Sequence, residues 1–389
     1  MWHPGDGVRL STVWAARRHR YAGVVETVDT QHWLAQLRRA VSERLSIGIA
    51  ELAETHAGVG AEVADLFTIA TGLLSGGKRL RAAFAAAGWA AFGGRDLSTP
   101  VVRAGAGLEL FQMAALVHDD VIDASLTRRG MPAAHRQLAA RHQTLGMQGD
   151  GDRFGQSGAV LLGDLLLVAS QQELERGLAD LPAAARGRAR SIMQAMMAEV
   201  TVGQYLDIYA QAAPWSTDPA VDLDRAHRVI RAKSASYSVQ QPLRLGAAMA
   251  GADDDGLAAC AAFGLPVGEA FQLRDDVLGV FGDPSLTGKP AGDDLREGKR
   301  TVLVTSAMTR ATAEQRAVLR AALGNPELQE TEVDRVRHIL TVTGAVGEVE
   351  QLIEERVTAG LRVLQGTAVS DRAAAVLRSL VQAAVTRTS

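Results

Sequence analysis

Three aspartates lie close together within an otherwise apolar stretch of the chain. They are Asp119, Asp120 and Asp123, with Leu116, Val117, Val121 and Ile122 around them. If the stretch is helical, residues three and four apart share a face, so the carboxylates repel one another unless a cation lies between them. Oxygen-only ligation favours a hard ion. Mg²⁺ typically takes one or two carboxylates and completes its shell with water and substrate phosphate oxygens.

Two arginines, Arg128 and Arg129, follow the aspartates. Guanidinium groups make bidentate contacts with phosphate. The stretch therefore predicts a site for a magnesium-bound diphosphate. The alternative is a solvated acidic helix face followed by a basic helix end, and the apolar neighbours of the aspartates argue against it.

A second basic cluster stands in the sequence GGKRLR, where Lys78 and Arg81 lie one turn apart at the expected start of a helix. Free N–H groups and the positive end of the helix dipole also favour an anion there. The alternative is a loop-to-helix junction with surface basic residues. Together with Arg129, the cluster is a candidate for a second diphosphate, separate from the magnesium-bound one.

A second acidic motif occurs about half a chain later, in FQLRDDVLG (271–279), where Asp275 and Asp276 stand in an expected apolar helix. A Gly/Pro/Asp-rich loop is expected over 282–298, and it carries Lys289, Asp293 and Asp294, with Lys299 just beyond. Acidic clusters on separate helices can face each other across a bundle core. Several Mg²⁺ ions could then bridge one diphosphate.

The elements that position these groups are expected to be helices. Aromatic residues make up 4% of the chain, Ala, Leu and Val are abundant, and period-two alternation is rare, so we predict an all-α protein. The expected helices span about 31–57, 63–74, 78–92, 101–126, 184–209, 223–249 and 255–281, with more helix over 300–386. Residues 146–158, with five glycines, are predicted to form a mobile loop, and Asp164 is expected to be the one buried polar residue of the apolar run that follows.

Domain organisation follows from the absence of any linker. We expect a poorly ordered extension over 1–29 and a single all-helical domain over 30–389.

The net charge of −3 offers no bulk signal for nucleic acid or an anionic membrane. Cys260 is the only cysteine, which excludes an intrachain disulfide and fits a reducing cytoplasm. No apolar run reaches about 18 residues, so no membrane span is expected.

Further polar residues lie at helical spacing on expected core helices. They are Lys233, Ser234 and Tyr237 in AKSASYS, and Gln204 with Asp207 in GQYLD. Each alone is more often a satisfied core polar residue than a site residue.

These motifs together resemble the trans-isoprenyl diphosphate (polyprenyl) synthase family. The likeness covers about residues 31–385 and includes GGKRLR, HDDVID with RRG, GQYLD, KSASYS, FQLRDDVLGVFGD and GKP in the family's order and spacing. It implies an all-α isoprenoid-synthase-type bundle around a deep central cavity, usually a homodimer. It also implies a reaction that joins isopentenyl diphosphate to an allylic diphosphate with Mg²⁺, three ions per site once diphosphate is bound.

The resemblance assigns roles residue by residue. By this likeness, five aspartates hold the metal ions on the allylic diphosphate: Asp119, Asp120, Asp123, Asp275 and Asp276. Residues matching contacts to the same diphosphate are Arg128, Lys233 and Lys289, with Lys299 nearby. Those matching the isopentenyl diphosphate pocket are Lys78, Arg81, Gln112 and Arg129. Gln272 and Ser234 match groups that line the cation site.

Two departures from the family pattern stand out. Ser234 replaces the usual threonine and keeps the hydroxyl, whereas Gly279 replaces the final aspartate of the second motif and puts one metal contact in doubt.

Product length is expected to depend on residues one and two turns before the aspartates, since one helical turn rises about 5.4 Å. Ala114 and Ala115 are small, and Phe111 and Met113 are the next large residues that could form a floor. In the family that the chain resembles, bulky residues at these positions stop the product at fifteen carbons and small ones let it grow longer, so the resemblance implies geranylgeranyl diphosphate as product. The alternatives are farnesyl or longer polyprenyl diphosphate synthesis, a non-catalytic partner subunit of another prenyl synthase, and a class I terpene cyclase. The two alanines could also serve only close helix packing.

Overall fold

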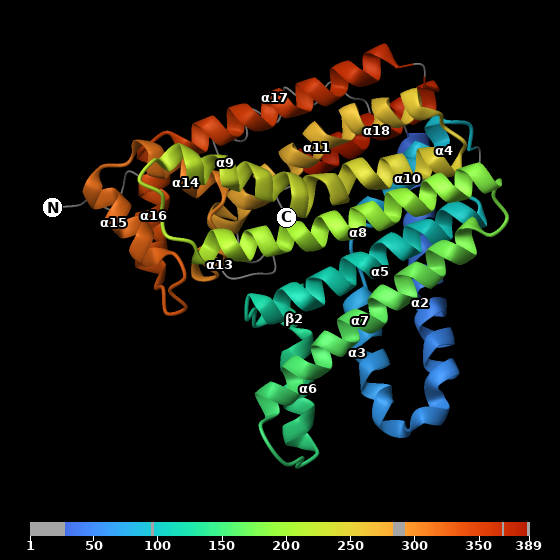
Figure 1. Cartoon of the computed structure of the whole chain (residues 1–389), viewed down its shortest axis with the longest axis horizontal. Coiled ribbons are helices and arrows are strands. Elements are labelled where there is room, and N and C mark those ends of the chain that lie inside the picture. Colours follow the sequence, from blue (N-terminus) through green and yellow to red (C-terminus); the bar gives the residue numbers. More distant parts are fainter. Residues whose placement is uncertain (1–27, 95–96, 283–291, 368, 387–389) are drawn as a thin grey trace.

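The computed structural model describes residues 28–94, 97–282, 292–367 and 369–386. Helices dominate this part of the chain (Figure 1). The first half contains α2 (Val28–His56), α3 (Ala64–Leu74), α4 (Leu80–Ala91), α5 (Thr99–Ile122), α6 (Ala134–Thr144) and α7 (Gly151–Leu178). The middle contains α8 (Ala183–Ala212), α9 (Pro219–Val229), the π-helix η3 (Ile230–Gln240), α10 (Gln241–Met249) and α11 (Asp254–Phe281). The remainder contains α13 (Asp293–Arg296), α14 (Val302–Arg310), α15 (Ala313–Ala322), α16 (Glu330–Val342), α17 (Ala345–Gly366) and α18 (Asp371–Val385).

Short elements complete the described chain. Two 3₁₀ turns, η1 (Ala57–Val59) and η2 (Ala61–Val63), join α2 to α3. The strands β1 (Thr127–Arg128) and β2 (Met131–Pro132) pair antiparallel, with Thr127 opposite Pro132. The prediction of an all-α protein is confirmed, although the hairpin formed by these two short strands was not predicted.

Helix α5 runs through the interior of the protein and carries the first aspartates. Small residues let its neighbours approach: a Cβ on Gly105 would lie 3.0 Å from the Cβ of Ala82 on α4, and one on Gly107 would lie 3.0 Å from the carbonyl oxygen of Ser170 on α7. The helix ends at Ile122, four residues earlier than predicted, because Ala124 adopts a left-handed conformation with φ 53°.

Helix α11 carries the second acidic motif and packs on η3 with the same kind of close approach. A Cβ on Gly264 would lie 2.6 Å from the Cα of Gln240, and one on Gly268 would lie 2.3 Å from the carbonyl oxygen of Ala235. The π-helical stretch lies inside the segment predicted as one α-helix over 223–249. Single π segments inside helices are frequent at functional sites.

The predicted mobile loop over 146–158 is wrong for most of its length, because α7 begins at Gly151. The carboxylate of Asp150 caps this helix by accepting hydrogen bonds from the N–H groups of Asp152 and Arg153. Gly155 is needed for packing, since a Cβ there would lie 2.2 Å from the carbonyl oxygen of His135 on α6. Asp164 is also not buried: its side chain is 59% exposed and lies beside His118.

One hydrophobic core connects the helices from α2 to α18. Fully buried side chains such as Phe84, Leu108 and Met196 lie in it. By length and composition α5 and α11 could each span a membrane, but 67% and 56% of their apolar windows are buried inside the protein, as in core helices. The predicted extension over 1–29 lies outside the described residues up to residue 27, and α2 already begins at Val28.

Candidate active site

A cavity of about 610 Å³ lies among α4, α5, α8, η3 and α11. Its wall brings together residues that are far apart in the sequence, including Asp119 from α5, Lys233 from η3 and Asp275 from α11. Asp119 of the first acidic motif and Asp275 and Asp276 of the second therefore face the same space, whereas Asp120 and Asp123 are not among the residues that line it. Apolar side chains such as Val200 and Phe271 share the wall.

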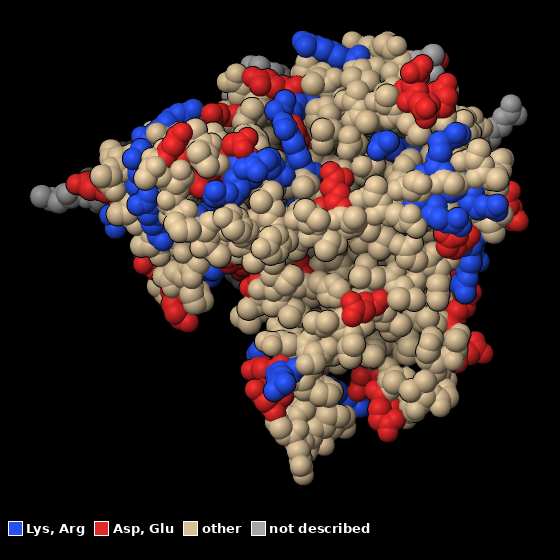
Figure 2. All heavy atoms as spheres, in the orientation of Figure 1, with Lys and Arg blue, Asp and Glu red and all other residues tan. Residues whose placement is uncertain are grey.

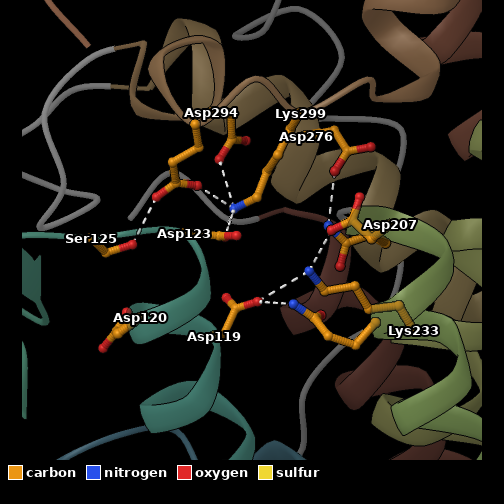
Figure 3. Close-up of polar contacts among 12 residues, drawn as sticks. Asp119, Asp120, Asp123, Ser125, Asp207, Lys233, Asp276, Asp294 and Lys299 are labelled. Carbon is orange, nitrogen blue, oxygen red and sulfur yellow. Dashed lines mark hydrogen bonds and ion pairs between the residues drawn. The ribbon is translucent and has the colours of Figure 1, made fainter. Parts of the chain in front are cut away.

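Asp119 is surrounded by donors from other helices. Its Oδ1 accepts a hydrogen bond from Nε2 of Gln204 at 2.9 Å and lies 3.2 Å from Nζ of Lys233 (Figure 3). The same ammonium contacts Oδ2 of Asp207 at 2.6 Å. Burial would raise the pKa of Asp119, but Lys233, Lys299 and Arg128 outweigh burial and hold that pKa well below its usual range. The Asp119 carboxylate is thus kept ionised.

The position of Lys233 depends on close packing of backbones. A Cβ on Gly203 of α8 would lie 2.5 Å from the backbone nitrogen of Lys233, so only glycine permits this approach. Although burial opposes the charge, Asp119 and Asp207 raise the pKa of Lys233 above its ordinary value. Gln204 and Asp207, which alone looked like ordinary core polar residues, are therefore partners of the first acidic motif.

The hairpin after α5 returns the chain toward the aspartates. Arg129 and Gly130 both have positive φ, 54° and 74°, which allows the tight turn between β1 and β2. Arg128 thereby reaches back to Asp120, where its Nε donates to Oδ1 at 2.9 Å and its Nη2 makes a second contact. Its guanidinium also lies 3.8 Å from Asp119.

Asp120 is 1% exposed and is not among the residues that line the cavity. In Figure 3 it lies apart from the group that Asp119 and Asp123 form with the lysines. In this structure its carboxylate holds Arg128, while the guanidinium of Arg128 lines the cavity.

Asp123 caps the C-terminus of α5 and contacts Lys299, whose Nζ lies 3.2 Å from its Oδ2. Burial raises the pKa of Asp123 to about 6, with Lys299 opposing this shift. Lys299 also pairs with Glu297 and lies 3.6 Å from Oδ1 of Asp294 (Figure 3). One ammonium therefore connects the first acidic motif to the segment that follows the second.

The second acidic motif has one buried and one less buried carboxylate. Asp276 is 5% exposed and accepts a hydrogen bond from Nε2 of Gln272 at 2.8 Å. Burial raises the pKa of Asp276 to about 8; the hydrogen bond from Gln272 opposes this shift, and Asp294 and Asp275 add to it. Asp275, Asp276 and Gln272 all line the cavity.

A cluster of cations forms another part of the wall. It consists of Lys78, Arg79, Arg81 and Arg129, and Arg128 lies next to it. Burial and the nearby Arg79 lower the pKa of Arg129, as expected where guanidinium groups crowd together. Nε of Arg81 and Oε1 of Gln112 are buried without a hydrogen-bond partner among the described residues. Such buried polar atoms at a cavity wall are suited to a polar ligand.

The remaining predicted residues fall into three groups. Ser234, Lys299 and Ala115 line the cavity. Phe111, Met113 and Ala114 are buried in α5 behind its wall, where Phe111 meets Tyr237 edge-on with ring centroids 5.8 Å apart. Lys289 lies outside the described residues.

Sequence reasoning missed Arg79, Glu109 and Glu297. Arg79 is 3% exposed, has φ 50°, and lies 3.7 Å from the carboxylate of Glu109. Glu297 accepts a hydrogen bond from Ser125 at 2.9 Å while it pairs with Lys299. A charged residue inside an apolar helix could have pointed to Glu109, whereas Glu297 has no such signal.

Comparisons with known proteins identify the family of the chain. The profile of the polyprenyl synthetase family matches residues 64–340. A geranylgeranyl diphosphate synthase of Mycobacterium tuberculosis is 33% identical over 295 residues, 75% of each chain. A geranylfarnesyl diphosphate synthase of Aeropyrum pernix is 30% identical over 280 residues, 71% of this chain and 79% of that protein.

A solved structure gives the same result. The geranylgeranyl pyrophosphate synthase of Corynebacterium glutamicum, solved with isoprenyl diphosphate and magnesium, superimposes with a TM-score of 0.85 at 38% identity, covering 90% of this chain and 99% of that one. The chain therefore belongs to the polyprenyl synthetase family. It is a prenyltransferase that builds isoprenyl diphosphate chains, as the sequence motifs predicted.

Proposed function

We propose that this enzyme condenses isopentenyl diphosphate head to tail with allylic diphosphates in a Mg²⁺-dependent reaction, and that its product is geranylgeranyl diphosphate. The observation that carries the proposal is the shared cavity. Acidic groups from two helices and a separate cluster of cations line it together, with apolar side chains between them. Such a wall suits two diphosphates of different binding mode attached to hydrocarbon tails.

The donor set fits Mg²⁺. Asp119, Asp275 and Asp276 offer oxygen ligands alone, which a hard cation prefers. Among the residues that the structure describes, no group of three or more His, Cys, Asp and Glu side chains is arranged to hold a metal ion by itself. Mg²⁺ typically takes one or two carboxylates and would complete its shell with water and diphosphate oxygens. We propose three ions per site, as the family resemblance implies.

In the proposed mechanism the C–O bond of the allylic diphosphate breaks to give an allylic cation and diphosphate. Bound Mg²⁺ would neutralise charge that develops on the leaving diphosphate. Arg128, Lys233 and Lys299 add fixed positive charge at the same end of the cavity, where preorganised cations stabilise the transition state. Lys289 completes this set by sequence likeness.

The basic cluster serves the second substrate. Lys78, Arg81 and Arg129 bind the isopentenyl diphosphate, with Gln112 as an additional donor or acceptor. Holding both substrates in one cavity aligns the double bond with the allylic cation. Apolar wall residues such as Val200 and Phe271 exclude water from the cation, and Gln272 and Ser234 line its site. The departing diphosphate accepts the proton that is lost last.

The twenty-carbon product is supported by small residues on α5. Ala115 lines the cavity and Ala114 lies beside it, fully buried, so no large side chain from these two positions blocks a growing chain. Phe111, packed against Tyr237, is the candidate floor further along the helix. We propose that the reaction takes place in the cytoplasm, in keeping with a single cysteine.

A homodimer is supported by an exposed apolar face. Leu161 and Val168 on α7 are 62% and 53% exposed, and Val202 and Tyr205 on α8 are 67% and 68% exposed. Figure 2 shows that the face over α5, α7 and α8 carries few charged side chains. Exposed apolar patches of this kind mark interaction sites, and a second copy of the chain is the proposed occupant.

The experiment is incubation of the purified enzyme with Mg²⁺, labelled isopentenyl diphosphate and each allylic starter, followed by chromatography of the products. We expect a twenty-carbon product, and none when EDTA removes the metal. Asp119→Ala and Asp275→Ala should each reduce turnover at least about a hundredfold. Asp334→Ala, on the exposed side of α16, is the matched control. Undiminished turnover in both site variants would contradict the proposal.

A further inference from the structure

The space around Gly279 is occupied by a carboxylate from another element. Gly279 lies one helical turn after Asp275 on α11 and lines the cavity. A Cβ built on it would lie 1.9 Å from Oδ2 and 2.6 Å from Cγ of Asp294, and the three nearest atoms all belong to that one side chain. The missing side chain at 279 therefore makes room for Asp294.

Asp294 comes from α13, which is anchored independently of α11. Leu295 is 1% exposed, and its carbonyl oxygen accepts a hydrogen bond from the N–H of Gly324 at 2.8 Å. Arg296 donates to the carbonyl oxygen of Leu328 at 2.9 Å. The segment between α15 and α16 thus holds α13 in place through these two hydrogen bonds. In this position α13 directs Asp294 toward the cavity.

Asp294 lies among groups that the proposed function uses. It lines the cavity with Asp275 and Asp276, and its Oδ1 is 3.6 Å from Nζ of Lys299.

We propose that Asp294 supplies the third acidic group on this side of the cavity, at the place that Gly279 leaves open. It takes part in binding divalent cations there and positions Lys299. This inference rests on the proposed function. By this inference, glycine at position 279 is required so that Asp294 can occupy the space. The absence of the second motif's final aspartate is then part of the site's construction.

The test is a double-mutant cycle between positions 279 and 294. Gly279→Ala adds only a methyl group, and the atoms that must move are the far end of the Asp294 side chain, so the fold is retained while the carboxylate is displaced. We expect Gly279→Ala and the isosteric Asp294→Asn each to weaken Mg²⁺-dependent binding of methylenediphosphonate, measured by calorimetry, about tenfold. In the Asp294→Ala background, Gly279→Ala should cause no further loss.

Two controls accompany the cycle. Gly347→Ala places the same methyl group in open space on α17, and Asp334→Asn removes an exposed carboxylate on α16; both should bind like the parent protein. Melting temperatures measured without ligand report any general loss of stability. Wild-type affinity in Asp294→Asn, or a full additional loss from Gly279→Ala in the Asp294→Ala background, would overturn the inference. Asp275→Ala, which should lose binding in either case, tests the proposed function separately.

Discussion

Replacement of Lys233 by methionine should separate the structural and the catalytic consequences of one buried ammonium. Nζ of Lys233 lies 2.6 Å from Asp207 and 3.2 Å from Asp119, and its side chain is 19% exposed. Methionine keeps much of the length of the side chain and removes the charge. Two carboxylates are then left with fewer counter-charges in a largely buried place.

The expected loss of stability follows from this burial. Removing one partner of a buried ion pair costs about 3–5 kcal/mol, and the remaining solvent contact of Lys233 places the expected loss near the lower end, at about 3 kcal/mol. Adding Asp207→Asn removes the uncompensated carboxylate and should recover most of that loss. Turnover should fall about a hundredfold in both variants, because the positive charge beside the departing diphosphate is absent in each.

Urea unfolding measured at equilibrium gives the stability, and product formation at saturating substrates gives the turnover. Arg228→Met is the matched control: Arg228 pairs with Asp224 on the surface, where the two side chains are 53% and 70% exposed, so the loss should stay below about 1 kcal/mol. If the double variant regained turnover together with stability, Lys233 would serve only to neutralise Asp207, and its proposed catalytic role would be refuted.

Three further predictions follow from the structure. Between pH 5 and 8 the folded state retains a proton on Asp276 that the unfolded chain releases near pH 4, so the protein loses stability as the pH rises towards the folded pKa of about 8. Asp276→Asn lacks this proton, so in EDTA the difference in melting temperature between Asp276→Asn and the parent should grow in favour of the variant by about 1 °C or more per pH unit. A difference that stays constant with pH would contradict this prediction. Ala115→Phe should shorten the product to fifteen carbons, as chromatography can show, and an unchanged product would exclude this part of the wall as a chain-length determinant. Leu161→Glu should shift the protein toward monomer in light scattering after size exclusion, whereas Val59→Glu, at another residue that is 71% exposed, should not.

Much of the fold could be predicted from local patterns. Helical periodicity and turn residues correctly indicated most helices, because amphipathic spacing and glycine breaks act within one segment. The glycine-rich stretch over 146–158 misled the prediction. The glycines there allow α7 to pack closely against α6. A glycine that is needed for close packing cannot be told from a loop glycine by the sequence alone, so the stretch looked like a loop.

For the site, too, local patterns predicted some features and tertiary packing decided the others. Residue types and spacing were sufficient to predict carboxylates for a hard metal ion and cations for diphosphate. They could not predict that Asp120 is buried against Arg128, because that contact depends on the hairpin after α5. Nor could they pair Asp207 with Lys233, which meet only where α8 packs on η3.

By itself, then, the sequence determined the class of fold and the chemistry that is present: helices with two acidic motifs and two groups of cations. The tertiary structure alone decided which charge meets which. Charges interact through space over a few ångströms, and only packing brings Lys299 to Asp123 or Asp294 into the space beside Gly279. Those distances depend on how distant segments pack together, which no local pattern in the chain encodes.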